Sequence, residues 1–183
     1  METKTKTTKK TKWALDPAHS ELMFKVKHMM IAHVKGEFRK FQAEINGEDF
    51  TKSPVHVTID ASSVFTNEET RDMHLKSTDF FDVENYRELS FEGTSVQKTG
   101  EDHYKLKGLL TIREITKEVT LDVVFGGVAK DPWGNTKAGF SVEGKINRKD
   151  WGLNWNAALE SGGILVGDEV TINAEVQFIK KAA

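Results

Sequence analysis

Apolar and polar residues alternate along most of this chain. In residues 19–28, for example, Phe24 and Val26 occupy one parity and Lys25 the other. Successive side chains of a β-strand point to opposite faces of a sheet, so this pattern predicts a strand with one buried face. The alternation returns about seven more times before the chain ends, which predicts one large sheet.

The alternation predicts eight strands, with one short helix between the third and the fourth. The strands are expected over residues 19–28, 33–46, 54–62, 89–96, 103–113, 118–128, 136–147 and 169–180. The inward parity of the second strand switches at Arg39-Lys40, which predicts a β-bulge there. Thr66 and Glu69 have the spacing of a capping box, so the helix is expected over residues 68–76. Eight antiparallel strands joined by short turns favour a closed barrel, so the predicted fold class is all-β.

Three glycines fall on inward parities of the predicted strands, namely Gly36, Gly108 and Gly144. An eight-stranded barrel is either filled by its own side chains or holds one small ligand. Small residues at inward positions favour an internal cavity. A glycine in a barrel strand is also typical of a bend or bulge, so both interpretations stay open at this point.

The composition fits one domain with a charged N-terminal arm. Residues 1–12 carry five lysines against one glutamate and are expected to be a disordered Lys/Thr-rich arm, with residues 13–183 forming the barrel domain. The alternative role for the arm is weak electrostatic contact with an anionic membrane surface. Since the whole chain has a formal net charge of −2, the remainder is acidic, which argues against a nucleic-acid partner.

Sequence motifs for catalysis, metals and cofactors are missing. The chain has no cysteine, its histidines lack metal-ligand spacing, and no nucleophile elbow or phosphate loop occurs, so no metal and no cofactor are expected. The first residues lack the apolar core of a secretory signal, and no apolar run is long enough to span a membrane, so a cytoplasmic location is expected. The alternative is an enzyme in which His28 or His74 meets Asp79 and hydrolyses a lipid ester, amide or pyrophosphate.

Five cationic or titratable residues are expected near one opening of the barrel: His28, Arg71, His74, Arg113 and Arg148. An apolar cavity with such groups at its edge suits an amphiphile, whose tail is buried and whose head group is held by charge and hydrogen bonds. The competing interpretation for each arginine is a salt bridge with a surface carboxylate. In the long segment 148–168, Trp151 and Trp155 are expected either to cover the opening or to form a barrel-end or subunit contact.

Several short motifs together resemble the YceI-like family. They are Trp13-x-Leu15-Asp16-x-x-His19-Ser20, Phe24-x-Val26-x-His28, Thr70-Arg71-Asp72-x-His74-Leu75, Asp79-Phe80-Phe81-Asp82 and Ile146-Asn147-Arg148-x-x-Trp151-Gly152. The resemblance implies an elongated lipocalin-like barrel that binds polyisoprenoids or fatty-acid derivatives and forms a homodimer. One departure is Tyr86-Arg87, where the family tends to have a Tyr-Pro pair.

The predicted function is a non-catalytic binding or carrier protein for a long-chain isoprenoid or a related fatty-acyl amphiphile. The head group is expected at His28, Arg71, His74 and Arg148. The residues expected to line the tail site are Phe24, Val26, Phe38, Phe91, Leu110, Ile112, Phe125, Phe140, Val142, Trp151 and Trp155.

Overall fold

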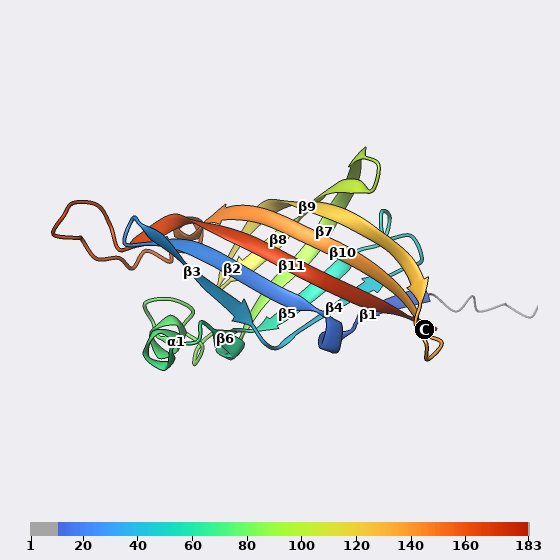
Figure 1. Ribbon diagram of the computed structural model, residues 1–183, viewed down its shortest axis with the longest axis horizontal. Helices are drawn as coiled ribbons and strands as arrows, with labels where there is room; N and C mark the ends of the chain where they lie inside the picture. The colour runs from blue at the N-terminus through green and yellow to red at the C-terminus, as the bar shows by residue number, and fades with distance from the viewer. Residues whose placement is uncertain (1–10, 183) are drawn as a thin grey trace, which may run out of the picture.

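The computed structural model describes residues 11–182, and within them eleven strands form one antiparallel sheet (Figure 1). The strands are β1 (Thr11–Leu15), β2 (Glu21–His28), β3 (Ala32–Phe38), β4 (Phe41–Asn46), β5 (Val55–Asp60), β6 (Val64–Phe65), β7 (Glu88–Gly100), β8 (His103–Ile112), β9 (Ile115–Lys130), β10 (Thr136–Asn147) and β11 (Val166–Ala182). One α-helix, α1 (Glu69–Lys76), lies between β6 and β7, and three short 3₁₀ turns are η1 (Pro17–His19), η2 (Ala61–Ser63) and η3 (Arg148–Trp151).

The sheet closes into an eight-stranded barrel. The ring runs β1-β4-β5-β7-β8-β9-β10-β11 and returns to β1, while β2, β3 and β6 extend it beyond β11. Three barrel strands are each broken in two: η1 separates β1 from β2, Arg39-Lys40 separates β3 from β4, and η2 separates β5 from β6. The predicted all-β barrel is therefore confirmed, and the irregularity expected at Arg39-Lys40 lies where the parity switch placed it.

The N-terminal strand was not predicted. Thr11 and Lys12 were expected in the disordered arm, but they belong to β1, which pairs with both β4 and β11. Residues 1–10 of the expected arm lie outside the described residues. The strand has five residues and is followed directly by the Asp16-Pro17 turn, so it is too short for its alternation to stand out.

The inward glycines do not leave empty space. A Cβ on Gly36 would lie 2.3 Å from Phe24 Cζ, and one on Gly108 would lie 2.3 Å from Phe91 Cζ. A Cβ on Gly144 would lie 2.4 Å from Leu121 Cδ2. Each glycine therefore lets a neighbouring side chain lie flat against the sheet. The expectation that these glycines themselves provide the cavity volume is wrong.

Strand β1 begins and β11 ends at the same end of the barrel (Figure 1). Aromatic side chains fill this end. Phe50, from the β4–β5 connection, packs against Tyr104 and Phe140 with ring centroids 5.1 Å apart in both pairs. Trp13 and Phe178 belong to the same buried cluster. Apolar side chains thus close this end, and the opposite end carries α1 and the β2–β3 hairpin.

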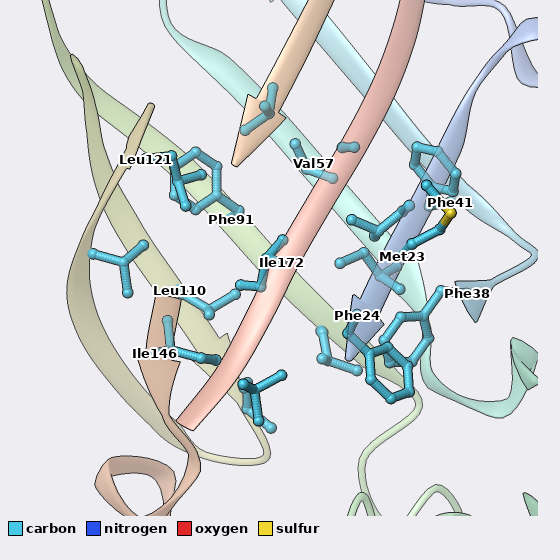
Figure 2. A pocket seen from close by; sticks show the side chains of 18 of the residues that line it. Met23, Phe24, Phe38, Phe41, Val57, Phe91, Leu110, Leu121, Ile146 and Ile172 are labelled. Carbon is cyan, nitrogen blue, oxygen red and sulfur yellow. The ribbon is translucent and has the colours of Figure 1, made fainter. Parts of the chain in front are cut away.

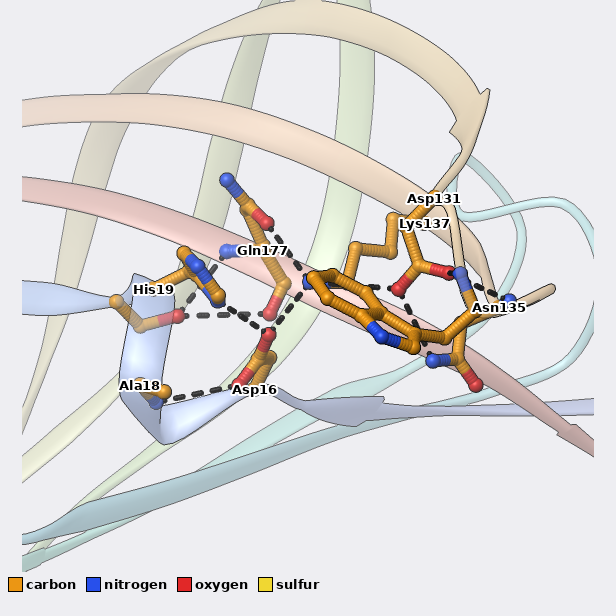
Figure 3. Close-up of polar contacts among 9 residues, drawn as sticks. Asp16, Ala18, His19, Asp131, Asn135, Lys137 and Gln177 are labelled. Carbon is orange, nitrogen blue, oxygen red and sulfur yellow. Dashed lines mark hydrogen bonds and ion pairs between the residues drawn. The ribbon is translucent and has the colours of Figure 1, made fainter.

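A polar network joins η1 to β10 and β11 near the aromatic end (Figure 3). Asp16 Oδ2 accepts from Lys137 Nζ at 2.7 Å and lies 2.8 Å from His19 Nδ1. Lys137 Nζ also donates to Gln177 Oε1 at 3.3 Å. The hydrogen bond from Lys137 is the main reason why the pKa of the buried Asp16 carboxyl lies below its ordinary value. The network therefore fixes the break between β1 and β2 to its neighbours.

Candidate ligand cavity

The barrel encloses an apolar cavity of about 690 Å³. Aliphatic and aromatic side chains from strands on all sides of the barrel line it, and Figure 2 shows several of them around the open interior. Small-molecule sites in proteins usually have volumes of about 300–1,000 Å³ and mostly apolar linings. The interior therefore has the size and chemistry of a site for an apolar ligand.

Most residues expected at the tail site line this cavity. They are Phe24, Val26, Phe38, Phe91, Leu110, Ile112, Phe140, Val142 and Trp155. Strand parity explains this agreement, since it alone decides which side chains of a barrel strand face inward. Phe125 and Trp151 are the exceptions among the predicted residues.

Phe125 and Trp151 lie in the packed core outside the cavity lining. The ring of Phe125 packs against Phe50, whose centroid is 5.0 Å away, and it is Phe50 that lines the cavity. Trp151 is 2% exposed, and its Nε1 donates to the carbonyl oxygen of Leu110 at 2.9 Å. Both residues therefore lie outside the cavity lining, and their role at the tail site stays a prediction. A core indole satisfies its single N–H in this way, and the η3 turn directs it there.

Some lining residues lie outside the predicted strands and were missed. Phe50 comes from a turn, and Phe80 and Phe81 come from the irregular segment after α1. Phe81 packs edge-on against Phe38 with centroids 5.5 Å apart. The adjacent pair of phenylalanines in a segment without strand periodicity is the only sequence signal for them.

Polar lining residues gather at the α1 end of the cavity, apart from Tyr104. They are His28, Thr66, Glu68, Thr70, Arg71, His74 and Arg148. All four residues expected at the head-group end are among them. They come from the end of β2, the segment before α1, the helix itself and the start of η3, which meet at this end of the barrel (Figure 1).

The N-cap of α1 is Glu68 rather than Thr66. The Glu68 carboxylate accepts backbone N–H groups of Thr70 and Arg71 at 3.1 and 2.6 Å, which lowers the pKa of Glu68. The capping box predicted for Thr66 and Glu69 is therefore wrong. Thr66 instead donates from its N and Oγ1 to Asp72 Oδ1, at 2.7 and 2.5 Å.

Arg71 is held in place by neutral acceptors. Its Nε donates to Thr66 Oγ1 at 2.7 Å, and its Nη2 donates to the Thr66 carbonyl at 2.8 Å. Among residues 11–182, no carboxylate lies within 4 Å of Arg71, and its Nη1 has no hydrogen-bond partner. The guanidinium is thus oriented at the polar end of the cavity with donors available for a ligand.

His74 lies between an acid and an indole. Its Nε2 is 2.9 Å from Asp79 Oδ2, so the meeting of His74 with Asp79 does occur. The imidazole packs edge-on against Trp155 with ring centroids 4.5 Å apart, and Phe80 packs against the same imidazole at 5.1 Å. Trp155 therefore brings the loop between η3 and β11 against α1 at the cavity opening.

Arg148 is buried and bonded to backbone carbonyls. Its exposed fraction is 3%, and burial lowers its pKa, with the charge of Asp168 acting in the opposite direction. The guanidinium donates to the carbonyl oxygens of Leu153 (2.5 Å), Trp155 (2.9 Å), Gly167 (2.9 Å) and Val166 (3.3 Å). These bonds occupy four of its five N–H groups. Arg148 therefore fixes the loop that carries Trp155, and only one of its N–H groups remains to donate to a head group.

Within the described part of the chain, no group of three His, Asp or Glu side chains could hold a metal ion. In the same residues, no helix is long and apolar enough to cross a membrane.

An eight-stranded antiparallel barrel with an apolar cavity that is polar at one end defines a ligand-binding barrel of lipocalin-like type. Residues 13–178 match the YceI-like domain, and the chain belongs to this family. A relative, the UPF0312 protein SA2479 of Staphylococcus aureus strain N315, is 42% identical over 171 residues, which cover 92% of this chain and 97% of the relative.

Solved structures share the fold. A Campylobacter jejuni YceI protein is 34% identical with a TM-score of 0.72, over 85% of this chain and 90% of the other. Burkholderia cenocepacia BcnA (24% identity, TM-score 0.74, 89% and 98% covered) and a polyisoprenoid-binding domain from Saccharophagus degradans (14% identity, TM-score 0.69, 92% and 98% covered) have the same fold.

Proposed function

We propose that this protein is a non-catalytic carrier that holds a long-chain isoprenoid or a related fatty-acyl amphiphile inside the barrel. The observation that carries the proposal is the cavity of about 690 Å³, with its apolar lining and its polar residues at one end. The naming of a structural neighbour as a polyisoprenoid-binding domain supports this ligand class. Membership of the YceI-like family supports a binding role.

The ligand's tail lies along the apolar lining, and its head group lies at the α1 end. Arg71 offers its Nη1, and His74 offers Nδ1 because its Nε2 already faces Asp79. A guanidinium without a carboxylate partner favours an acceptor-rich head group such as a carboxylate, phosphate or quinone carbonyl. The aromatic group of Trp155 and His74 covers the opening once the tail has entered.

Tail length determines affinity in this proposal. Each buried methylene contributes about 0.8 kcal/mol, or about fourfold in Kd. The experiment is to extract the purified protein with organic solvent, identify the extract by mass spectrometry, and titrate the emptied protein with prenyl and acyl chains of increasing length. Affinity is expected to rise with length until the cavity is filled. Equal affinity for short and long tails would contradict the proposal.

A second candidate function is hydrolysis at the cavity opening. The specific observation in its favour is the contact of 2.9 Å between His74 and Asp79, which orients an imidazole as a general base would require. The test is turnover of lipid esters, amides and pyrophosphates by the native protein and by His74→Ala. Turnover that disappears in a folded His74→Ala variant would replace the carrier proposal.

The homodimer implied by the family resemblance stays a prediction. Light scattering on the purified protein measures its mass in solution and decides between one chain and two.

A further inference from the structure

Three consecutive apolar residues protrude at the tip of the β2–β3 hairpin. The exposed fractions are 45% for Met29, 48% for Met30 and 82% for Ile31. Single exposed apolar residues are ordinary on protein surfaces, but a run of them on one projection marks an interaction site. The hairpin lies at the α1 end of the molecule, far from the chain's C-terminus (Figure 1).

The backbone at this tip is unfavourable for the residues that occupy it. Met29 has φ 53° and Met30 has φ 64°, values that suit Asn or Gly. They are the two central residues of the turn that Ile31 N closes by donating to the carbonyl oxygen of His28 at 3.2 Å. A long side chain in this left-handed region costs stability relative to Asn-Gly. The tip therefore keeps two methionines at positions where folding alone would favour small polar residues.

The tip is continuous with the opening of the cavity. Met29 N donates to the carbonyl oxygen of Leu165 at 2.8 Å, and a Cβ on Gly163 would lie 3.1 Å from Met30 Cγ. Ile164 in the same loop is 37% exposed. His28 and Leu165, which directly adjoin these exposed residues, line the cavity. The hairpin tip and the loop thus form one apolar projection beside the opening.

Positive charge flanks this projection. On the outward face of the hairpin, Lys27 pairs in register with His33, and Lys25 pairs with Lys35. Among the described residues, none of these three lysines has a carboxylate within 4 Å. The adjoining loop carries Glu160, and the adjoining strand carries Asp168 and Glu169, which lie within 4 Å of Lys149 and Lys145, and Glu175. The acidic residues on the outward face of the hairpin are Glu21 and Glu37, and Glu37 pairs with Arg39. The lysines therefore stand as an unneutralised group on a chain whose formal net charge is −2.

We propose that this projection, Met29 to Ile31 with Ile164, docks the protein on anionic lipid bilayers. The apolar tip enters the interface while Lys25, Lys27 and Lys35 lie over the phosphates, a pairing of apolar insertion and basic charge that gives reversible membrane binding. The cavity opening then faces the bilayer, so an apolar ligand moves between membrane and barrel without crossing water. This last consequence rests on the proposed carrier function, whereas the docking itself does not.

A second copy of the chain fits the projection less well. A stable protein interface buries about 1,200–2,000 Å², far more than one hairpin tip and one loop residue offer. A symmetric contact through the tip would also bring the same lysines of both copies together.

The experiment measures cosedimentation of the full chain, without added ligand, with phosphatidylcholine vesicles that contain about 30% phosphatidylglycerol or none. The tip variant combines Met30→Asn with Ile31→Asn. Asn tolerates the positive φ of residue 30, and residue 31 does not have a positive φ, so the hairpin should stay folded. The charge variant combines Lys27→Gln with Lys35→Gln. The matched control is Trp133→Asn, which removes a side chain that is 82% exposed. Trp133 lies in the β9–β10 turn, and the start of β10 pairs with the last part of β11.

We expect the native protein and the control to bind anionic vesicles, and the tip variant to bind at least about tenfold more weakly. The charge variant loses the preference for anionic vesicles and its dependence on salt. The proposal is overturned if the native protein does not bind them, if the tip variant binds as tightly as the native protein, or if the control alone loses binding. It is also overturned if light scattering shows a dimer for the native protein and a monomer for the tip variant.

Ligand titration in detergent separates this inference from the carrier function. Tip variants that keep their ligand affinity but lose vesicle binding support both. Vesicle binding by a protein that takes up no prenyl or acyl chain would leave the docking surface standing and refute the carrier function.

Discussion

Gly36→Ala tests whether this glycine lets the ring of Phe24 lie against the sheet and outside the cavity. Gly36 faces Phe24 across the β2–β3 pair, and its new Cβ would lie 2.3 Å from the ring, against about 3.4 Å for ordinary contact. The ring has to retreat by about 1.1 Å. Phe24 lines the cavity, and the ring of Phe38 is close behind it, with its centroid 5.7 Å away. The displaced ring of Phe24 therefore enters the cavity.

Two measurable losses follow from this displacement. Overpacking costs roughly 1–3 kcal/mol, and the stiffer unfolded chain returns about 0.4–1 kcal/mol, so the free energy of unfolding is expected to fall by about 1–2 kcal/mol. If the ring excludes two methylenes of tail, Kd rises about fifteenfold for long ligands and stays unchanged for tails too short to reach it. Urea denaturation and titration with a chain-length series measure the two effects.

Gly139→Ala is the matched control in the same sheet. No atom lies within 4 Å of a Cβ built on Gly139, and its φ is not positive, so alanine should be neutral there. Adding Phe24→Leu to Gly36→Ala should restore affinity for long tails. If Gly36→Ala behaves like Gly139→Ala in both assays, the ring does not border the ligand space and the reasoning is refuted.

Three further predictions concern residues with fixed partners. Arg148→Met leaves the carbonyls of Leu153, Trp155 and Gly167 without their side-chain donor, whereas that of Val166 keeps Asn156 Nδ2 at 2.7 Å. The free energy of unfolding should therefore fall by about 3 kcal/mol or more, whereas the exposed Lys149→Met should change it by less than about 0.5 kcal/mol. Equal urea midpoints would contradict this. Because Lys137 lowers the pKa of Asp16, the Asp16 carboxylate stabilises the fold above about pH 4, and that contribution is lost as the pH falls through the lowered pKa. Asp16→Asn should therefore destabilise the protein at pH 7 and match the native protein in urea denaturation near pH 2, and a pH-independent difference would count against the network. Trp155→Ala removes the contact with His74 and should speed ligand release about two- to tenfold in stopped-flow measurements. The urea midpoint of the barrel should stay nearly unchanged. An unaltered release rate would show that the indole does not cover the opening.

The barrel could be predicted from the sequence because period two is a property of the strand backbone. Strand β10 shows this well, since its bounds, Thr136–Asn147, equal the predicted range. The parity switch at Arg39-Lys40 also identified the break between β3 and β4. By contrast, β1 is joined to the sheet by pairing with β4 and with β11. Its five residues are too few for their alternation to predict that pairing.

The candidate site was only partly visible in the sequence. Parity places strand residues inside a barrel but says nothing of turns. Phe50, which lines the cavity, was therefore missed, and the burial of Trp151 outside the lining was not foreseen. The sequence also shows that Arg148 is charged but not that backbone carbonyls surround it. Likewise, the sequence shows that Gly36 has no side chain, but not that the ring of Phe24 occupies the space where a Cβ would lie. In each case the deciding partner is a backbone group or a side chain from another element.

The breaks in the barrel strands explain why the opening lies at the α1 end. Arg39 N donates to the carbonyl of Ser63, and Asp60 N donates to that of Lys40, so the β3–β4 and β5–β6 breaks adjoin each other, and η1 borders the same surface groove. Beyond the breaks, β6 pairs with β3 and, within the described residues, has no pairing with β7. Segment 66–87, which connects β6 to β7, is held by side-chain bonds within itself, such as those from Thr66 to Asp72, and not by a strand ladder. Regions with few ladder hydrogen bonds open more readily than continuous sheet. In the proposed function, a long tail therefore enters the barrel at the α1 end, beside the polar residues and the exposed hairpin tip.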